Sequence, residues 1–254
     1  MDLLVNGCLG YMGREVTELC ARGYRGATLA IGIDPDADGT SNIYPTVGDI
    51  PSLDGVDCIV DFSHHSAVGP LLDLATSAAI PTVIATTGHT RDELAVIHRA
   101  SRTIPVFHSA NMSLGVALLV ELAETVALAM PDAEIEIVEK HHNRKLDAPS
   151  GTALMIADAI REARPYAYVR AGRCGLSRRT RGEIGIHSLR MGSAVGEHEV
   201  IISTGTQTLT LKHEAHSRTI FAEGAIAAAE FIIGCECGLY GMKNLISCER
   251  ECVL

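Results

Sequence analysis

Three glycines at three-residue spacing, Gly7, Gly10 and Gly13, follow an apolar run at residues 3–7 and open a helical pattern at 12–22. The G-x-x-G-x-x-G spacing is a variant of the dinucleotide-binding fingerprint. In that fingerprint the glycines let the backbone approach a pyrophosphate, whose charge is met by amides at the helix N-terminus. A glycine turn after a first strand can also be purely structural. The position of the loop favours a Rossmann-like sheet that begins with this strand.

Strand and helix patterns alternate through the first 110 residues. Further apolar runs predict strands, and periodic segments between them predict helices. Such alternation indicates a doubly wound parallel sheet with helices on both faces, which is an α/β fold. The predicted strands are 28–34, 57–63, 81–88 and 103–109, and the predicted helices are 67–78 and 91–101.

The pattern changes after residue 110. Residues 182–213 hold two or three strands with period-two alternation, which predicts an α+β domain with a mixed, more antiparallel sheet. A closing helix at 222–234, followed by a short tail, could return to the first domain. The other predicted elements are a helix at 113–130, a strand at 133–142 and a helix at 151–163.

Composition excludes several classes of function. The 254-residue chain has a net charge of −10, so we expect no nucleic-acid partner, and an anionic ligand needs a local cationic patch. No run of about 18 apolar residues occurs, which predicts no membrane span. The N-terminus lacks the features of a secretion signal.

The eight cysteines include no paired C-x-x-C units of the zinc type. Cys235-x-Cys237 and Cys248-xxx-Cys252 could in principle hold a metal. The alternative that we expect is free thiols in a reducing compartment. The chain is therefore predicted to be a soluble cytoplasmic protein without a metal.

Asp34 ends the second predicted strand, about 20 residues after Gly13, where a ribose-binding carboxylate is expected. Its charge would repel a 2′-phosphate, and the next residue, Pro35, offers no cation. NADH is therefore the preferred coenzyme, with NADPH possible. A turn-forming Asp-Pro is the structural alternative.

At the ends of the fourth and fifth strands, ATTG (85–88) and SANMS (109–113) leave room for a nicotinamide, although both could be ordinary turns.

Residues 139–153, EKHHNRKLDAPSGTA, gather titratable and basic side chains just ahead of a helix. Ser150 is a good N-cap, so the amides of Gly151 and Thr152 would be ready for an anion. Lys145 can neutralise a carboxylate, and a histidine can exchange protons at neutral pH. A solvated basic loop before a capped helix is the alternative.

The segment HHNRKLDAPSGTA resembles the signature of the dihydrodipicolinate reductase (4-hydroxy-tetrahydrodipicolinate reductase) family. Further matching segments, in family order, are VNGCLGYMGR, IVDFS, ATTG, SANMSLGV, GEIGIHSLRMGSAVGEHEVIIS, SRTIFAEGAI and GLYGMKNLI. The resemblance covers nearly the whole chain. Three positions depart from the family pattern: Ala85 replaces a glycine, Met112 a frequent phenylalanine, and Pro35 a frequent basic residue.

The resemblance implies a two-domain, NAD(P)H-dependent reductase of lysine and diaminopimelate biosynthesis. Residues 1–113 and 221–254 would bind the dinucleotide, and residues 114–220 would bind a dicarboxylate substrate and form a homotetramer through their sheet. His141 would be the proton donor and Lys145 its partner, with the substrate carboxylates on His142, Gly151 and Thr152. The coenzyme residues would be Gly7, Cys8, Leu9, Gly10, Tyr11, Met12, Asp34, Ala85, Thr86, Thr87, Ser109, Ala110, Asn111 and Met112.

In the family reaction, hydride from the nicotinamide adds to a conjugated cyclic imine after water is lost, and the resulting enamine is protonated on carbon. The alternatives are another NAD-dependent imine or amino-acid dehydrogenase and a non-catalytic NAD-binding sensor, both with the same nucleotide domain. The stretch RAGRCGLSRRTRG (170–182) contains five arginines and is expected to be a mobile, solvated loop. A tetramer or nucleotide contact is its alternative role.

Overall fold

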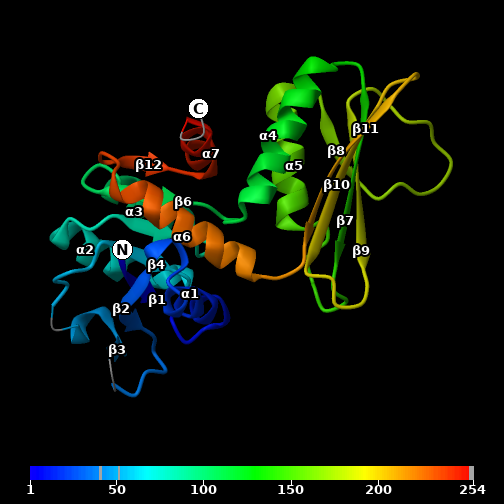
Figure 1. Cartoon of the computed structure of the whole chain (residues 1–254). Helices are drawn as coiled ribbons and strands as arrows, with labels where there is room; N and C mark the ends of the chain where they lie inside the picture. Colours follow the sequence, from blue (N-terminus) through cyan, green and yellow to red (C-terminus); the bar gives the residue numbers. More distant parts are fainter. Residues whose placement is uncertain (40–41, 51, 252–254) are drawn as a thin grey trace. The chain divides into compact units, whose positions relative to one another are not determined.

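The computed structural model describes residues 1–39, 42–50 and 52–251, so Cys252 lies outside the described residues. The chain forms two compact units (Figure 1). Unit 1 contains Met1–Leu114 and Thr219–Leu254, and unit 2 contains Gly115–Arg218. The chain therefore leaves unit 1 once and returns to it.

Unit 1 is built on a parallel sheet with the strand order β12-β6-β5-β4-β1-β2-β3. Every neighbouring pair of these strands is parallel. The order reverses beside β1, which puts the glycine loop at the switch point where dinucleotides bind in such sheets. The strands are β1 (Asp2–Asn6), β2 (Thr28–Ile33), β3 (Ile43–Tyr44), β4 (Cys58–Asp61), β5 (Thr82–Ile84), β6 (Pro105–His108) and β12 (Gly238–Tyr240).

The helices of unit 1 bury small and aliphatic side chains against this sheet. Leu71 and Leu72 of α2 and Ile97 of α3 pack with Leu4 and Ile59 of the sheet. Helix α6 contacts β4, β5, β6 and α1, and its many alanines allow this close approach. The helices are α1 (Tyr11–Ala21), α2 (Val68–Ala78), α3 (Arg91–Ala100), α6 (Thr219–Ile233) and α7 (Met242–Glu251), with short 3-10 turns η1 (Tyr24–Gly26), η2 (Val47–Asp49) and η3 (His65–Ala67).

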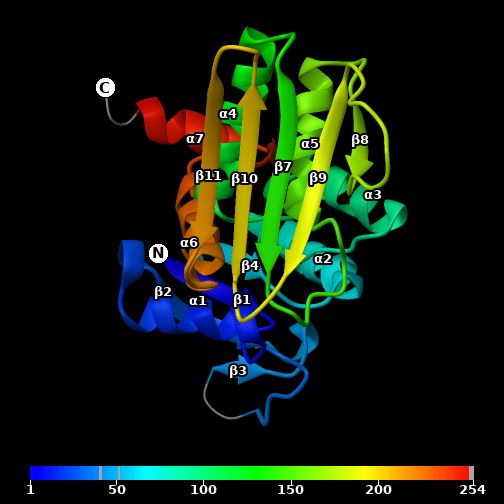
Figure 2. The same ribbon diagram turned by 90° about the vertical axis from the view of Figure 1, so that its right-hand side faces the viewer.

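Unit 2 has a mixed sheet with the order β11-β10-β7-β9-β8, seen face-on in Figure 2 with α4 and α5 behind it. Strand β10 is antiparallel to β7 and β11, whereas β7, β9 and β8 run parallel. The elements are α4 (Leu114–Ala129), β7 (Glu134–His141), α5 (Gly151–Ala163), β8 (Tyr168–Ala171), β9 (Glu183–Arg190), β10 (Gly196–Ser203) and β11 (Thr208–Ala215).

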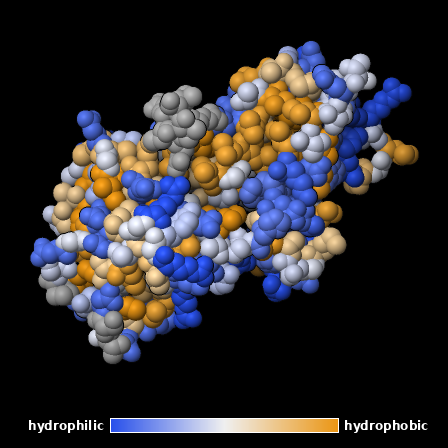
Figure 3. Space-filling model, viewed as in Figure 1, coloured by the Kyte–Doolittle hydropathy of each residue, from blue (hydrophilic) through white to orange (hydrophobic). Residues whose placement is uncertain are grey.

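Burial alternates strictly along β7, which fixes the direction of its side chains. Ile135, Ile137, Glu139 and His141 are buried, on the face where the core residues of α4 and α5 pack. On the side seen in Figure 3, hydrophobic side chains gather over α4. No helix in the described residues combines the length and apolar character needed to cross a membrane.

The predicted α/β fold with a second mixed-sheet part is confirmed, but several edge elements escaped prediction. The strands β3, β8 and β12 and the helix α7 were not predicted. The expected short tail is therefore wrong: β12 pairs with β6, and α7 follows it. A three-residue strand is too short for a periodicity, so the pairing with a distant neighbour decides its structure.

Gly224 of α6 packs directly against the backbone of the segment that precedes α4. A Cβ there would lie 1.7 Å from the carbonyl oxygen of Met112. We expect Gly224→Ala to lower the free energy of unfolding by roughly 1–3 kcal/mol, because the helix must move away from a backbone atom. The measurement is chemical denaturation.

Gly69→Ala is the matched control, because Gly69 lies in α2 of the same unit and a Cβ there meets nothing within 4 Å. It should be neutral or slightly stabilising. Equal stability of the Gly224→Ala protein and the wild type would contradict this packing.

Candidate active site

The glycine loop lies tightly against the rest of unit 1. Gly7 has a φ of 78°, and a Cβ on it would lie 2.8 Å from the carbonyl oxygen of Phe62. A Cβ on Gly13 would lie 2.0 Å from the carbonyl oxygen of Gly7. Gly10 is the N-cap of α1 and has no side chain that could cap the helix. Gly7 and Gly13 therefore admit only glycine, and the start of α1 at Gly10 is left open to an anion.

A cavity of about 580 Å³ opens beside this loop, entirely within unit 1. Its walls come from the segments that follow β1, β4, β5 and β6 and from the start of α6. Its volume is in the range of ordinary ligand pockets. The lining residues are Tyr11, Met12, Phe62, Ser63, His64, His65, Ala85, Thr86, Thr87, Ala110, Asn111, Met112 and Phe221. The cavity wall thus includes part of each predicted segment, whereas Gly7, Cys8, Leu9, Gly10 and Ser109 are not among its lining residues.

A buried polar network joins the ends of three strands beside this cavity. The fully buried carboxylate of Asp61 accepts hydrogen bonds from the side chains of Asn6 (2.8 Å), Ser63 (2.6 Å) and Thr86 (2.8 Å). These bonds fix the Thr86 side chain in the cavity wall. Asn6, Asp61 and Ser63 were not predicted as site residues. The sequence signal for Asn6 and Asp61 was that each is a polar residue at the end of an apolar strand.

The Asp34 carboxylate lies directly after β2 and is only 6% exposed. Its Oδ2 accepts a hydrogen bond from the amide of Leu9 (2.9 Å), and its Oδ1 accepts one from the amide of Asp36 (3.1 Å). The glycine loop and Asp34 therefore hold each other in place. The same contact occupies the Leu9 amide, which cannot then point freely at a ligand.

Two histidines that were not predicted, His64 and His65, also line the cavity of unit 1. The Nδ1 of His65 lies 2.9 Å from Oε1 of Glu93. Glu93 also completes the capping box of α3 with Thr90, and these hydrogen bonds lower the pKa of Glu93 to about 2. No periodic pattern pointed to His64 and His65, because they lie on the turn that follows β4.

In unit 2, His141 lies at the end of β7 beside an ionised carboxylate. Its Nδ1 is 2.6 Å from Oε2 of Glu139. Arg190 of β9 donates to both oxygens of Glu139, at 2.7 and 2.8 Å, and the Ser150 amide donates to Oε1 at 3.1 Å. Burial alone would raise the pKa of Glu139, but the hydrogen bonds, led by those from Arg190, hold it at about 2.

The start of α5 lies beside this pair. The Ser150 hydroxyl accepts a hydrogen bond from the Ala153 amide, which confirms the predicted N-cap. It also lies 3.1 Å from Nε2 of His198, a buried histidine of β10. Gly151 is exposed, and a Cβ there would meet nothing within 4 Å, so the first turn of α5 has room for a ligand.

Positive charge gathers on the loop between β7 and α5. The Nζ of Lys145 lies 2.8 Å from Oδ1 of Asp147. The Nδ1 of His142 is buried and has no hydrogen-bond partner among the described residues. Burial lowers the pKa of His142, and the nearby charges of Arg144 and Arg218 lower it further. His142 therefore favours its neutral form and has a ring nitrogen available for a hydrogen bond.

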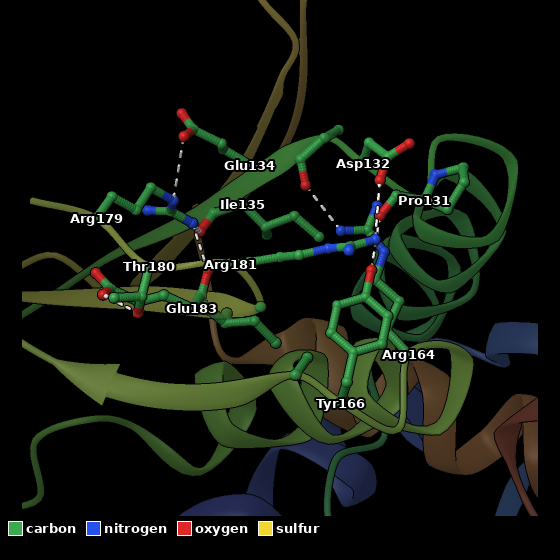
Figure 4. A pocket seen from close by; sticks show the side chains of 14 residues that line it. Pro131, Asp132, Glu134, Ile135, Arg164, Tyr166, Arg179, Thr180, Arg181 and Glu183 are labelled. Carbon is green, nitrogen blue, oxygen red and sulfur yellow. Dashed lines mark hydrogen bonds and ion pairs between the residues drawn. The ribbon is translucent and has the colours of Figure 1, made fainter.

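A second cavity, of about 310 Å³, lies elsewhere in unit 2 (Figure 4). Its lining includes three arginines and three acids. Arg181 pairs with Asp132 at 3.2 Å, and the buried Arg164 donates to backbone carbonyls of Ala127 and Ala133. Because its charges are already compensated, this cavity is a poor match for an anion. The lining charges are Arg164, Arg179, Arg181, Asp132, Glu134 and Glu183.

The expected solvated loop at 170–182 is wrong in part. Its first residues belong to the edge strand β8, and Arg170 and Arg173 pair with the buried Glu183. Arg179 pairs with Glu136 of β7. Arg170, Arg173 and Arg179 therefore bind carboxylates of their own unit, a role that charge counting along the sequence could not reveal.

Comparisons with known proteins match both parts of the chain to one family. Residues 1–112 match the family model of the dihydrodipicolinate reductase N-terminus, and residues 115–246 match that of its C-terminus. A 4-hydroxy-tetrahydrodipicolinate reductase of Caldanaerobacter subterraneus subsp. tengcongensis is 43% identical over 96% of this chain and 97% of its own length. One of Clostridium novyi is 39% identical over 98% and 99%.

A solved structure has the same fold. It is the dipicolinate-bound dihydrodipicolinate reductase from Paenisporosarcina sp. TG-14, which superimposes with a TM-score of 0.79. The match covers 96% of this chain and 98% of that one, at 23% sequence identity.

Proposed function

The chain belongs to the dihydrodipicolinate reductase family, and we propose that it reduces 4-hydroxy-tetrahydrodipicolinate, through dihydrodipicolinate, to tetrahydrodipicolinate in lysine and diaminopimelate biosynthesis. Relatives that are 43% and 39% identical over almost their whole length bear the name of this reductase. The observation that carries the proposal furthest is that His141, the capped start of α5 and Lys145 belong to one short segment of unit 2.

The coenzyme site that we propose is the cavity of unit 1 with its glycine loop. Gly7 and Gly13 leave no room for a Cβ, and Gly10 opens the helix start to a pyrophosphate. Asp34 would bind the adenosine ribose. A reduced nicotinamide coenzyme, when bound, supplies the hydride. The loop residues would be Gly7, Cys8, Leu9, Gly10, Tyr11 and Met12, and the nicotinamide would contact Ala85, Thr86, Thr87, Ser109, Ala110, Asn111 and Met112.

The substrate site that we propose is the loop between β7 and α5 with the first turn of α5. Gly151 and Thr152 would bind one carboxylate through their amides, His142 would donate or accept a hydrogen bond, and Lys145 would offset negative charge. The related Paenisporosarcina enzyme is described as dipicolinate-bound. That ligand is a planar dicarboxylate, which supports a dicarboxylate as the ligand here.

His141 would protonate the enamine that remains after hydride addition. The imidazolium N–H bond breaks, a C–H bond forms on the ring carbon, and the neutral imidazole later recovers a proton from water. A correctly placed general acid of this kind contributes roughly 10²–10⁴-fold to the rate. Lys145 would offset negative charge on the dicarboxylate and keep the imidazolium of His141 oriented.

The experiment that tests this function is NADH oxidation with freshly prepared 4-hydroxy-tetrahydrodipicolinate. Rapid turnover is expected. If the chain instead turns over another cyclic imine or an amino acid, it is a different dehydrogenase on the same nucleotide domain. If it binds NADH and turns over none of these compounds, it is a coenzyme sensor, and the proposal fails.

Coenzyme preference is expected to favour NADH over NADPH by at least about tenfold in kcat/KM, or 1.4 kcal/mol. The Asp34 carboxylate is held by the Leu9 amide, and Pro35 adds no cation, so a 2′-phosphate would meet uncompensated negative charge. The measurement is kcat/KM with each coenzyme at saturating substrate. Equal or better values with NADPH would contradict this preference, and Asp34→Ala should narrow the difference if the carboxylate causes it.

We further propose that the enzyme is a cytoplasmic homotetramer. The sheet of unit 2 is packed on one side by the core residues of α4 and α5, and its other side has half-buried and exposed residues along β7 and β11. This second face would form the subunit contacts. The proposed location rests on free thiols, which are usual in reducing compartments. They are Cys8, Cys20, Cys58, Cys174, Cys235 and Cys237. Sedimentation or gel filtration with light scattering tests the assembly.

A further inference from the structure

We propose that Glu139 is the positioning residue of the proton donor: it holds the Nδ1–H of His141, so that the proton given to substrate leaves from Nε2. This inference rests on the proposed function in one respect, namely that His141 is the proton donor. Glu139 itself touches neither substrate nor coenzyme in this proposal, and it acts only through the imidazole.

Glu139 and His141 are neighbours because both lie on strand β7. Side chains two residues apart on a strand point to the same face, so Glu139 and His141 of β7 lie next to each other on the core face. The carboxylate is completely buried, and its Oε2 lies 2.6 Å from Nδ1 of His141. Strand geometry therefore sets this contact without any contribution from a flexible loop.

The charge state of Glu139 decides the tautomer of His141. Two donors of the Arg190 guanidinium, at 2.7 and 2.8 Å, and the Ser150 amide, at 3.1 Å, surround the carboxylate. A carboxylate held by such donors is ionised, and an ionised carboxylate can only accept hydrogen bonds. Nδ1 of His141 must therefore donate. In the neutral imidazole Nδ1 keeps its hydrogen, and Nε2 is the atom that loses and regains the transferable proton.

The space around Nε2 is consistent with this role. Gly196 at the start of β10 lies next to the ring, and a Cβ on it would stand 3.1 Å from Nε2. Because the residue is glycine, that volume holds no side chain. A side chain at this position would therefore crowd the reactive nitrogen, whereas Nδ1 already contacts Glu139.

The charged groups around His141 come from four elements. Glu139 lies on its own strand, Arg190 on β9, Lys145 on the loop before α5 and His198 on β10, with its ring centroid 5.2 Å from that of His141. Burial lowers the pKa of His141 most, the hydrogen bond and charge of Glu139 raise it, and Lys145 and Arg190 lower it again. The net effect lowers the pKa of His141 from its ordinary value, and Glu139 limits this decrease.

The direct test measures the wild-type protein labelled with ¹⁵N-histidine, and a variant serves only to assign the signals. The ¹⁵N shifts of His141, assigned by the loss of its signals in His141→Gln, report which ring nitrogen bears the hydrogen in the neutral form. We expect Nδ1–H. A neutral form with its hydrogen on Nε2 would overturn the proposal.

The second test is the pH profile of Glu139→Gln, which keeps the size of the side chain but removes its charge. Without that charge the pKa of His141 falls, so the protonated donor persists only at lower pH. The decline of kcat with rising pH should therefore shift to lower pH, and kcat at neutral pH should drop by at least about tenfold. An unshifted decline in a folded variant that still binds NADH would also overturn the proposal.

Glu136→Gln is the matched control. Glu136 lies on the opposite face of β7, where it pairs with His187 at 2.9 Å and with Arg179, so it repeats the same residue types away from His141. Its pH profile should match that of the wild type at the same oligomeric state. If the wild-type protein does not turn over the substrate, only the proposed function is rejected. The ring nitrogen of His141 that bears the hydrogen can still be determined, because that measurement needs no turnover.

Discussion

His141→Gln is expected to lower kcat by roughly 10²-fold or more while NADH binding stays near the wild-type value. Glutamine retains the size and polarity of histidine and can still donate to Glu139, but it has no proton that titrates near neutral pH. The proposed coenzyme residues all belong to unit 1, whereas His141 belongs to unit 2, so coenzyme affinity has no direct reason to change. Steady-state kinetics and NADH titration by fluorescence provide the two measurements.

His187→Gln serves as the control for this result. His187 also pairs with a glutamate of β7, but with Glu136 on the other face of the strand. Its kcat should stay close to that of the wild type. If His141→Gln retains most of its kcat, the proton comes from another group, and His142→Gln becomes the variant to measure next.

Lys145→Ala is expected to raise the inhibition constant of pyridine-2,6-dicarboxylate by on the order of tenfold to a hundredfold, since a charge-assisted contact contributes roughly 1.5–3 kcal/mol. This compound presents two carboxylates without a reducible imine, so it should compete with the substrate. In the structure the Lys145 ammonium already binds Asp147 at 2.8 Å. That contact keeps the ammonium on the loop before α5, and the substituted enzyme should also turn over more slowly.

The matched control is Lys140→Ala. Lys140 belongs to the same basic segment but faces the other side of β7, where it pairs with Glu197. Its loss should leave the inhibition constant unchanged. An unchanged inhibition constant in folded Lys145→Ala would remove this lysine from the dicarboxylate site and leave Arg144 as the neighbouring cation to examine.

The features that the sequence predicted correctly depend on residues close together in the chain. Ser150 caps α5 because a cap involves a single turn, and the helix at 151–163 was predicted with the bounds that the structure has. The glycine loop likewise depends on residues that are close together in the chain. The roles in catalysis and binding assigned to His141, Lys145 and the coenzyme residues stay predictions until the variants are measured.

The features that escaped prediction depend on strand pairing. Arg190 reaches Glu139 only because β9 lies beside β7, and Asn6 reaches Asp61 only because β4 lies beside β1. No spacing along a single sequence shows which distant strands become neighbours. Glu139 did carry a local signal, since it alternates with His141 on a strand whose other inward residues are apolar. A charged residue on such a face needs partners, and that need could have been recognised.

The return of the chain to unit 1 has a consequence for biosynthesis. A ribosome delivers the chain from its N-terminus, and compact units tend to fold as soon as all of their parts have emerged. All segments of unit 2 are complete at Arg218, whereas unit 1 still lacks α6, which packs on β4, β5 and β6, and the edge strand β12. The nascent protein therefore finishes its second unit first. The nucleotide-binding sheet stays exposed to chaperones and proteases until the last part of the chain has been synthesised.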